Sequence, residues 1–198
     1  MIGITQMRTR LGREAALLPD PVPAHPLLDG RPEIGRGEYS VVIDKGDGER
    51  VYKLASSPAD YFLYTADDRP RGRHFPRIYR DHGIIGRARS GYPLHLIEME
   101  RLYPLEEGSS AAEIAARLAA FYWSACEQWA QLGADMGRIA LFHLTLNPLG
   151  VGESIERALQ ALADFVEAYQ VMPDILNPDN LMMRKDGTLV FSDPVFLG

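Results

Sequence analysis

The sequence has little cysteine, no long apolar run and no excess of positive charge. Its one cysteine, Cys126, excludes an intramolecular disulfide framework and a zinc site built on several cysteines. No run of about 18 apolar residues is present, so no membrane-spanning segment is expected. The N-terminal residues also lack the basic and apolar regions of a secretory signal. These absences predict a cytoplasmic protein without a membrane partner.

Basic residues are outnumbered by acidic ones. The 198 residues include 21 Lys and Arg against 27 Asp and Glu, a formal net charge of -6. Because proteins that coat DNA or RNA need a basic surface, general nucleic-acid binding is not expected. Hydrophobic residues make up 46% and charged residues 24%, which is typical of a globular protein and predicts one domain, or one domain with a tail.

The first 30 residues are predicted to form an extended arm. Three prolines fall between Pro21 and Pro26, and closely spaced prolines block regular helix. Residues 1–30 are therefore expected either to lie on the following domain or to flex away from it. Residues 31–198 are expected to form that domain.

Beyond the arm, the residue pattern predicts strands first. Runs of β-branched and aromatic residues, bounded by turn residues, predict strands over 39–43, 50–54 and 92–100. A serine followed by a proline predicts the start of a short helix over 57–68. Residues 69–91 are rich in arginine and glycine and are expected to be irregular.

Two helices and a hairpin are predicted in the second half of the chain. Ser110 and Glu113 have the spacing of a capping box, which predicts a helix that continues to about Leu132. Apolar residues three or four positions apart predict a second helix over 153–170, and a strand hairpin is expected over 181–192. Strands followed by helices indicate an α+β protein with two packed lobes.

A glycine-rich turn lies between two predicted strands near the start of the domain. Gly35 and Gly37 would let the backbone approach phosphate oxygens closely, with Tyr39 at the tip. The segment joins strand to strand, which disfavours a Rossmann dinucleotide site. It resembles the loop that protein kinases fold over ATP phosphates, with Ser40 in place of a third glycine. A purely structural turn is the alternative.

Three further residues follow in an order typical of phosphoryl-transfer enzymes. Lys53 ends the returning strand, where a lysine can reach the α- and β-phosphates, although an exposed strand lysine is the alternative. Asn180 and Asp193 are thirteen positions apart and flank the predicted hairpin. The hairpin would bring two hard oxygen ligands together, as Mg²⁺ bridging nucleotide phosphates requires.

Together these motifs resemble the protein-kinase-like superfamily, in particular the small early Ser/Thr kinases of short-tailed lytic phages (autographivirus type). The segments that carry the resemblance are Gly35–Ser40, Val51–Lys53, Phe75–Tyr79, Asn180–Met182 and Asp193–Val195. The resemblance implies a truncated, minimal kinase-like fold with two lobes. The antiparallel N-lobe would span residues 31–102 and the helical C-lobe residues 103–198.

The resemblance also implies binding of ATP and Mg²⁺, and phosphoryl transfer to Ser or Thr of a host protein in the host cytoplasm. It assigns site residues by role: the phosphates to Gly35, Gly37, Tyr39, Ser40 and Lys53, the adenine to backbone groups near Glu100 and Leu102, Mg²⁺ to Asn180 and Asp193, and the acceptor-hydroxyl proton to Asp174.

Asp174 departs from the kinase spacing by one residue. Kinases place the catalytic Asp five residues before the metal-binding Asn, and that spacing selects Ile175, whose side chain cannot accept a proton. A one-residue bulge would bring Asp174 into place. Asp179 is a weaker substitute.

Two other departures favour a second hypothesis. No glutamate lies between Lys53 and Glu98, so the lysine would have to pair with Asp60 or Asp67. The chain also ends without an activation segment, so an active enzyme would need a partner or dimer mate to complete its substrate site. The alternatives are a catalytically impaired pseudokinase that binds and inhibits a host protein, and a secreted minimal effector kinase.

A local basic cluster stands out in this acidic chain. It comprises Arg69–His74 with Arg77 and Arg80. Such a cluster can bind phosphate or an acidic partner. A solvated loop is the alternative.

Overall fold

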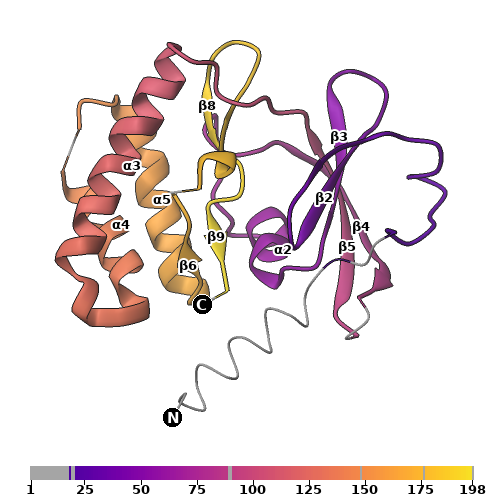
Figure 1. Cartoon of the computed structure of the whole chain (residues 1–198), viewed down its shortest axis with the longest axis horizontal. Helices are drawn as coiled ribbons and strands as arrows, with labels where there is room; N and C mark the ends of the chain where they lie inside the picture. The colour runs from indigo at the N-terminus through magenta and orange to yellow at the C-terminus, as the bar shows by residue number, and fades with distance from the viewer. Residues whose placement is uncertain (1–17, 19–20, 89–90, 148, 176, 198) are drawn as a thin grey trace. The chain divides into compact units, whose positions relative to one another are not determined.

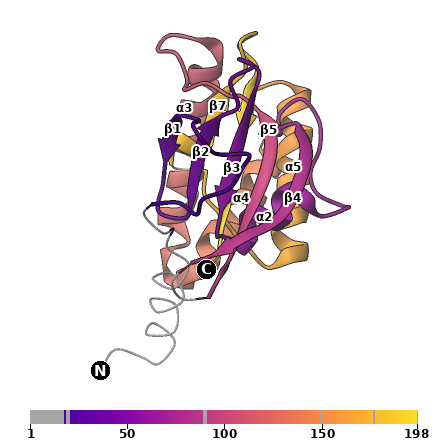
Figure 2. The same cartoon turned by 90° about the vertical axis from the view of Figure 1, so that its right-hand side faces the viewer.

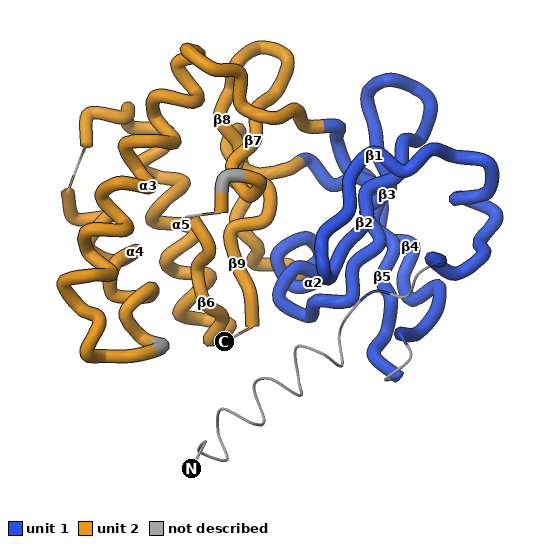
Figure 3. The backbone as a smooth tube through the Cα atoms, viewed as in Figure 1, with its two compact units in different colours: residues 1–65, 77–101 blue, residues 66–76, 102–198 orange. Residues whose placement is uncertain are grey.

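The protein is described here by a computed structural model that covers residues 18, 21–88, 91–147, 149–175 and 177–197. The chain forms two compact units (Figure 3). Unit 1 comprises the residues up to Thr65 together with Arg77–Arg101, and unit 2 comprises Ala66–Pro76 and the residues from Leu102 onward. Unit 1 is built on an antiparallel sheet and unit 2 is mainly helical, which confirms the predicted α+β class. Within the described residues, no helix has the length and apolar character needed to cross a bilayer.

The sheet of unit 1 has five strands, in the order β1-β2-β3-β5-β4, and every neighbouring pair is antiparallel (Figure 2). The strands are β1 (Glu33–Arg36), β2 (Ser40–Asp44), β3 (Arg50–Ala55), β4 (Ile78–Arg87) and β5 (Pro93–Glu100). The turn at Lys45–Gly48 joins β2 to β3, as the sequence predicts. Because β3 is central, it is buried at every position except Arg50.

Both faces of this sheet are covered, so successive residues of a strand pack against different parts of the chain. On one face, Val41, Leu54 and Leu96 join a core cluster with Leu28 of the arm, and Leu18, Val22 and Leu27 pack against the same cluster. The described part of the arm therefore lies on the sheet. The short helix α2 (Pro58–Thr65) follows β3 and supplies the buried residues Ala59, Asp60, Leu63 and Tyr64.

Strand β4 corrects the prediction that residues 69–91 are irregular. Its residues are mostly exposed or half-buried, and it pairs with β5 through three shifts in register. An edge strand needs only one hydrogen-bonded side and tolerates charges and bulges. Gly83 takes a left-handed φ of 74° at one of these irregularities. The charged, glycine-containing sequence of β4 therefore does not show the pattern of a strand, and the strand is recognised from its pairing with β5.

The described residues of unit 2 form three α-helices, two short 3₁₀ helices and two small pairs of strands (Figure 1). Its elements are α3 (Ser110–Gln128), the 3₁₀ helix η1 (Ala130–Asp135), α4 (Met136–Leu146), α5 (Glu153–Tyr169), β6 (Met172–Pro173), the 3₁₀ turn η2 (Pro178–Asn180), β7 (Leu181–Met183), β8 (Leu189–Phe191) and β9 (Val195–Phe196). The predicted stripe on α5 is buried at Ile155, Leu159, Leu162 and Val166. Strands β7 and β8 form the predicted hairpin, and β6 pairs with β9.

The first long helix differs from its prediction at both ends. Ser109, not Ser110, is the N-cap, because its Oγ accepts the amide N–H of Ala112. The helix ends at Gln128, before the predicted Leu132, and the chain continues as a 3₁₀ turn in which Gly133 has a φ of 62°. That kink separates α3 from α4, which the sequence pattern does not reveal.

The segment 66–76 belongs to unit 2, although the predicted N-lobe includes it. Two buried residues anchor it there. His74 Nδ1 lies 2.8 Å from the Leu189 carbonyl and its Nε2 lies 3.0 Å from Ser154 Oγ. The Phe75 ring lies 5.8 Å from that of Phe191. The packing of Phe75 and the hydrogen bonds of the buried His74 therefore hold residues 66–76 in unit 2, although the strands of unit 1 are their neighbours in the sequence.

Burial of His74 makes the stability of the fold depend on pH. Burial is the main cause that lowers the pKa of this imidazole below its usual value. At a pH between the lowered pKa and the usual value of about 6.5, the unfolded chain binds more protons at this histidine than the folded chain does. The contribution of neutral His74 to the free energy of unfolding is therefore fully present above about pH 6.5 and is lost as the pH falls. We expect His74→Asn to flatten this dependence in urea unfolding between pH 5 and 7.5. An equal effect of the control His143→Asn would contradict the assignment.

Candidate functional site

Lys53 lies in the interior of unit 1 and is held by two residues of α2. Its Nζ is 3.3 Å from Asp60 Oδ2 and donates a hydrogen bond of 2.8 Å to the Tyr64 hydroxyl. Lys53 and Asp60 are each 4% exposed. The lysine is therefore not an exposed strand residue, and Asp60 is its carboxylate partner. Asp67, the other candidate, is exposed and lies beyond the end of the helix.

The glycine-rich turn and Lys53 lie on one face of the sheet. Gly35 is paired with Val42, and Val42 with Lys53, across three adjacent strands. Residues directly opposite one another share a face, and neighbouring strands are about 4.8 Å apart. Gly35 is thus about 10 Å from Lys53 along the same row, with no side chain of its own.

The two glycines are not required by the packing of the turn itself. A Cβ at Gly35 would meet only Val42 Cβ, at 3.8 Å, and a Cβ at Gly37 would meet Ser40 atoms at 3.9 Å. Neither glycine has a positive φ. The Gly37 amide donates to the Ser40 carbonyl at 2.8 Å, and the Tyr39 carbonyl accepts from the Ser56 amide at 2.9 Å. The turn is thus fixed by its backbone, and a Cβ at either glycine would make only ordinary van der Waals contacts.

The residues assigned to adenine differ in their surroundings. The Glu100 amide donates to the Arg77 carbonyl at 2.9 Å, and its carboxylate accepts the Arg77 amide, also at 2.9 Å. The sheet therefore already uses the Glu100 amide. Leu102 is half-buried and precedes Tyr103, which pairs with Met183. The structure gives a polar function to the Glu100 side chain that the sequence did not predict.

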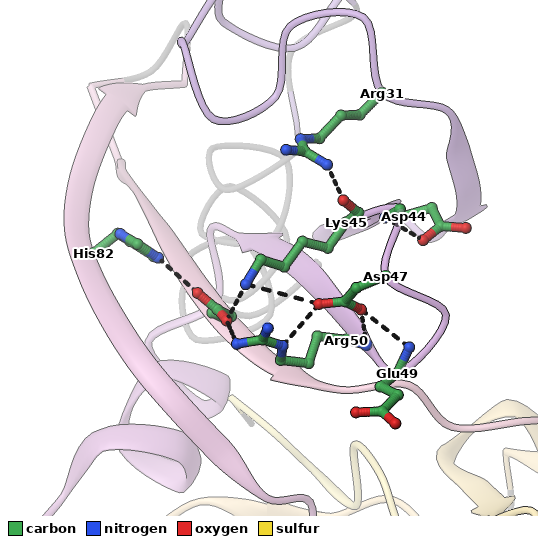
Figure 4. A network of polar contacts seen from close by, with 9 residues as sticks. Arg31, Asp44, Lys45, Asp47, Glu49, Arg50 and His82 are labelled. Carbon is green, nitrogen blue, oxygen red and sulfur yellow. Dashed lines mark hydrogen bonds and ion pairs between the residues drawn. The ribbon is translucent and has the colours of Figure 1, made fainter.

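A buried carboxylate in unit 1, Glu98, forms a network that sequence reasoning missed. Its Oε1 accepts from Lys45 Nζ at 2.6 Å and from Arg50 at 2.9 Å, and its Oε2 lies 3.5 Å from His82 Nε2. Figure 4 shows Lys45, Arg50 and His82 converging. Burial raises the pKa of Glu98, but the hydrogen bonds and charges of its partners, Lys45 above all, outweigh burial and lower the pKa overall.

Glu98 faces away from Lys53. Glu98 is opposite Tyr52 in the register of β3 and β5, whereas Lys53 is opposite Ile97. Because successive residues of a strand point to opposite faces, Glu98 belongs to the arm-covered face and Lys53 to the other. This network is a structural feature of the sheet, and it is separate from the contact between Lys53 and Asp60 on the other face.

In unit 2, the residues assigned to the metal and to the proton lie together. The Asn180 carbonyl accepts the Ser192 amide at 2.8 Å and the Asp193 amide at 3.4 Å, so η2 and the end of β8 are tied together. Asn180 Nδ2 donates to the Asp174 carbonyl at 3.0 Å. The Asp174 amide in turn donates to the Pro194 carbonyl at 2.7 Å. Asp174, Asn180 and Asp193 thus form one backbone-locked cluster.

Asp174, Ile175 and Asp179 differ in their surroundings. Ile175 is 1% exposed and lies in the core, which explains why the residue in strict register is apolar. Asp174 is half-buried, and its carboxylate interacts with the side chain of Asn180 and the backbone of Asn177. Asp179 is exposed. The β6–β9 pairing holds Pro173 opposite Val195 and so fixes the position of the Asp174 backbone, which follows directly.

The environment of Asp174 suits a proton acceptor. Burial is the main cause that raises its pKa, and the nearby Asp193 raises it further, whereas hydrogen bonds from Asn180 and Asn177 act in the opposite direction. A carboxylate with a raised pKa is a stronger base than an exposed one. A cation bound at Asp193 would remove part of that repulsion.

The cluster fits a cation that also binds phosphate. The side-chain nitrogen of Asn180 donates to the Asp174 carbonyl, so the Asn180 side chain can offer its oxygen, Oδ1, to a cation. Oδ1 and the Asp193 carboxylate are therefore the candidate oxygen ligands. In the described part of the chain, no three His, Cys, Asp or Glu side chains are grouped as a metal site. Mg²⁺ commonly takes one or two protein oxygens and completes its shell with water and phosphate. These residues fit Mg²⁺ in that partial role.

Tyr122 supports the cluster from α3, which the sequence did not indicate. Its hydroxyl donates to the Pro173 carbonyl at 3.1 Å, one residue before Asp174. Burial and the nearby Cys126 and Asp174 raise the pKa of Tyr122, so the phenol stays protonated as a donor. Gly137 of α4 gives this hydroxyl its space, because a Cβ there would lie 2.8 Å from it.

We expect Gly137→Ala to destabilise the protein by about 2 kcal/mol, although alanine normally favours a helix over glycine. The added Cβ would push the rigid Tyr122 ring off the Pro173 carbonyl. Denaturant unfolding of Gly137→Ala, Tyr122→Phe and the double variant measures this. The penalty of the alanine should largely vanish in the Tyr122→Phe background, and an unchanged penalty there would contradict the explanation.

No family model matches this chain, and no curated protein matches its sequence. The function therefore has to be argued from the two groups of residues described above.

Proposed function

We propose that the protein binds Mg²⁺-ATP and transfers the terminal phosphoryl group to a Ser or Thr hydroxyl of a protein target. The observation that carries the proposal is the cluster of Asp174, Asn180 and Asp193 in unit 2. It combines a carboxylate of raised pKa with two oxygen ligands suited to Mg²⁺. The buried Lys53 and the turn at Gly35 and Gly37, whose backbone carries no side chain at these two positions, support it in unit 1.

Each residue would have a distinct role in that reaction. Asp174 would orient the acceptor hydroxyl and take its proton as the oxygen attacks phosphorus. The bond from phosphorus to the bridging oxygen of ADP would break, and Lys53 would offset the charge on the phosphates. Asn180 and Asp193 would hold Mg²⁺, which neutralises phosphate charge when bound. The chain thus supplies positioning and electrostatic stabilisation.

A pseudokinase that acts by binding a protein is the second candidate. One observation favours it: Lys53 already has a carboxylate and a hydroxyl as partners in a buried environment. A lysine satisfied in this way can be purely structural. The two candidates differ in whether phosphate is transferred, and a response to nucleotide and Mg²⁺ is required of the kinase only.

Thermal unfolding with Mg²⁺-ATP separates these candidates. A ligand that binds only the native state raises Tm, and at 100 times Kd it adds about 2.7 kcal/mol of stability. We expect a Tm rise that needs both ATP and Mg²⁺ and that is lost in Asp193→Asn. Absence of any rise at millimolar Mg²⁺-ATP would overturn the nucleotide proposal. A rise without transfer of labelled phosphate to protein would leave the pseudokinase.

A further inference from the structure

The segment 66–76 presents arginines from a rigid anchor on unit 2. His74 and Phe75 are 5% and 3% exposed and fix the segment against Leu189, Ser154 and Phe191. The arginines Arg69, Arg71 and Arg73 alternate along the chain before this anchor. Arg71 and Arg73 are exposed and Arg69 is half-buried. A fixed backbone lowers the entropy cost of using these side chains to bind a partner.

The three guanidinium groups are oriented by neutral acceptors. Arg69 donates to the Ala66 carbonyl at 3.2 Å, Arg71 to the Asp67 carbonyl at 3.0 Å, and Arg73 to Thr188 Oγ1 at 3.2 Å. No ion pair to a carboxylate is seen for these arginines within the described ranges. Other arginines of the protein do have one: Arg36 with Glu33, Arg50 with Asp47 and Arg157 with Glu153.

Nearby acidic side chains offset part of this charge, since Asp67 acts electrostatically on Arg69, and Asp186 on Arg184 and Arg73. Asp68 accepts the Tyr169 hydroxyl, and Asp186 accepts the Thr188 amide. Arg71 lies close enough to Arg69 to lower the pKa of Arg69 by repulsion, in addition to the larger effect of burial. Arg184 adds a further cation, since its guanidinium donates to the carbonyls of Arg73 and Phe75. The four arginines outnumber the three nearby aspartates, Asp67, Asp68 and Asp186, so a small local excess of positive charge remains in a chain of net charge -6.

We propose that Arg69, Arg71 and Arg73 form a docking surface for an acidic segment of a partner protein, rich in Asp and Glu. Guanidinium groups bind carboxylates through paired, charge-assisted hydrogen bonds. A nucleic acid fits less well, because a long phosphate backbone would also run along the rest of a chain of net charge -6, whereas a short acidic segment needs to contact only the arginines. This proposal does not depend on phosphoryl transfer.

Binding of a fluorescent peptide that contains a run of Asp and Glu tests the surface. The full chain should bind it, with affinity that rises as salt falls. The variant Arg69→Gln/Arg71→Gln/Arg73→Gln should bind at least about 10-fold more weakly, since three charge-assisted contacts are lost. The matched control Arg87→Gln/Arg117→Gln/Arg157→Gln removes the same charge at other exposed positions and should change Kd by less than about 2-fold.

Three results would overturn the proposal: no binding of the acidic peptide, an equal loss in the control variant, or tighter binding of a single-stranded RNA of the same charge. If the triple variant does not fold, Arg71→Gln serves instead, because Arg71 is exposed and bonds only to a backbone carbonyl. Its expected loss is about 3-fold. The Tm response to Mg²⁺-ATP should be the same in all these variants, so failure here is distinguishable from failure of the proposed activity.

Discussion

The Asp174→Asn variant is expected to lose phosphoryl transfer by about 10³-fold and to be more stable than the natural protein. The carboxylate is half-buried beside Asp193, and these two causes raise its pKa. A raised folded pKa means that the native state binds more protons than the unfolded chain, so ionised Asp174 destabilises the fold at neutral pH. Asparagine removes that charge but cannot accept the proton of the acceptor hydroxyl.

The pH dependence gives this prediction a second readout. In the natural protein, the contribution of Asp174 to stability declines as the pH rises from about 3.9 through the raised folded pKa. The stability gain of Asp174→Asn over the natural protein should therefore grow as the pH rises from 4 to 7. Urea unfolding and a labelled-phosphate assay measure the two effects.

Asp179→Asn is the matched control, because it makes the same chemical change at an exposed residue five positions away. It should leave both stability and transfer nearly unchanged. Equal loss of transfer in both variants would show that the overall charge of this region matters, not the position of Asp174. A stability loss in Asp174→Asn would contradict the inference that burial and Asp193 destabilise the ionised Asp174 carboxylate.

Breaking the pair of Lys53 and Asp60 is expected to have the largest effect on stability. Lys53 is 4% exposed, so removing Asp60 takes the carboxylate away from a buried ammonium group. Loss of one member of a buried ion pair costs about 3 kcal/mol or more. Replacing both residues with apolar ones removes the charge as well as its partner, which is often nearly neutral. We therefore expect Asp60→Leu to be severely destabilised and Lys53→Met/Asp60→Leu to recover most of the loss.

Nucleotide distinguishes a functional lysine from a structural one. If Lys53 binds phosphate, Mg²⁺-ATP supplies a new counter-charge and should restore more stability to Asp60→Leu than it adds to the natural protein. The recovered double variant should be folded and show no response to nucleotide. A double variant that still responds fully to Mg²⁺-ATP would remove Lys53 from the site.

The sequence predicted those parts of the fold that local pattern determines. The strands at β2, β3 and β5, the helix α5 and the β7–β8 hairpin all follow from periodicity and turn residues. Strand β4 was missed because an exposed edge strand carries no apolar alternation, and α4 because the kink at Gly133 is a matter of backbone geometry. The cap moved to Ser109 because adjacent serines are equivalent in sequence.

The candidate site could be predicted in part for the same reason. The order of Lys53, Asn180 and Asp193 was visible, but the choice between Asp174 and Ile175 depended on which side chain enters the core. Asp60 became the lysine partner over Asp67 because α2 ends at Thr65. Support by Tyr122 and Gly137 arises between helices far apart in sequence, which no local pattern records.

The anchoring of residues 66–76 has a consequence for dissecting the protein. The chain leaves the sheet after Thr65, returns at Arg77 and leaves again after Arg101, so neither unit is one continuous stretch. A fragment cut after Arg101 would keep His74 and Phe75 but lose Leu189 and Phe191, and would expose a buried imidazole and an apolar ring. The remainder would lack the residues that fill its own interior. Truncation therefore cannot assign activity to either unit, and point substitutions in the whole chain are the appropriate tool.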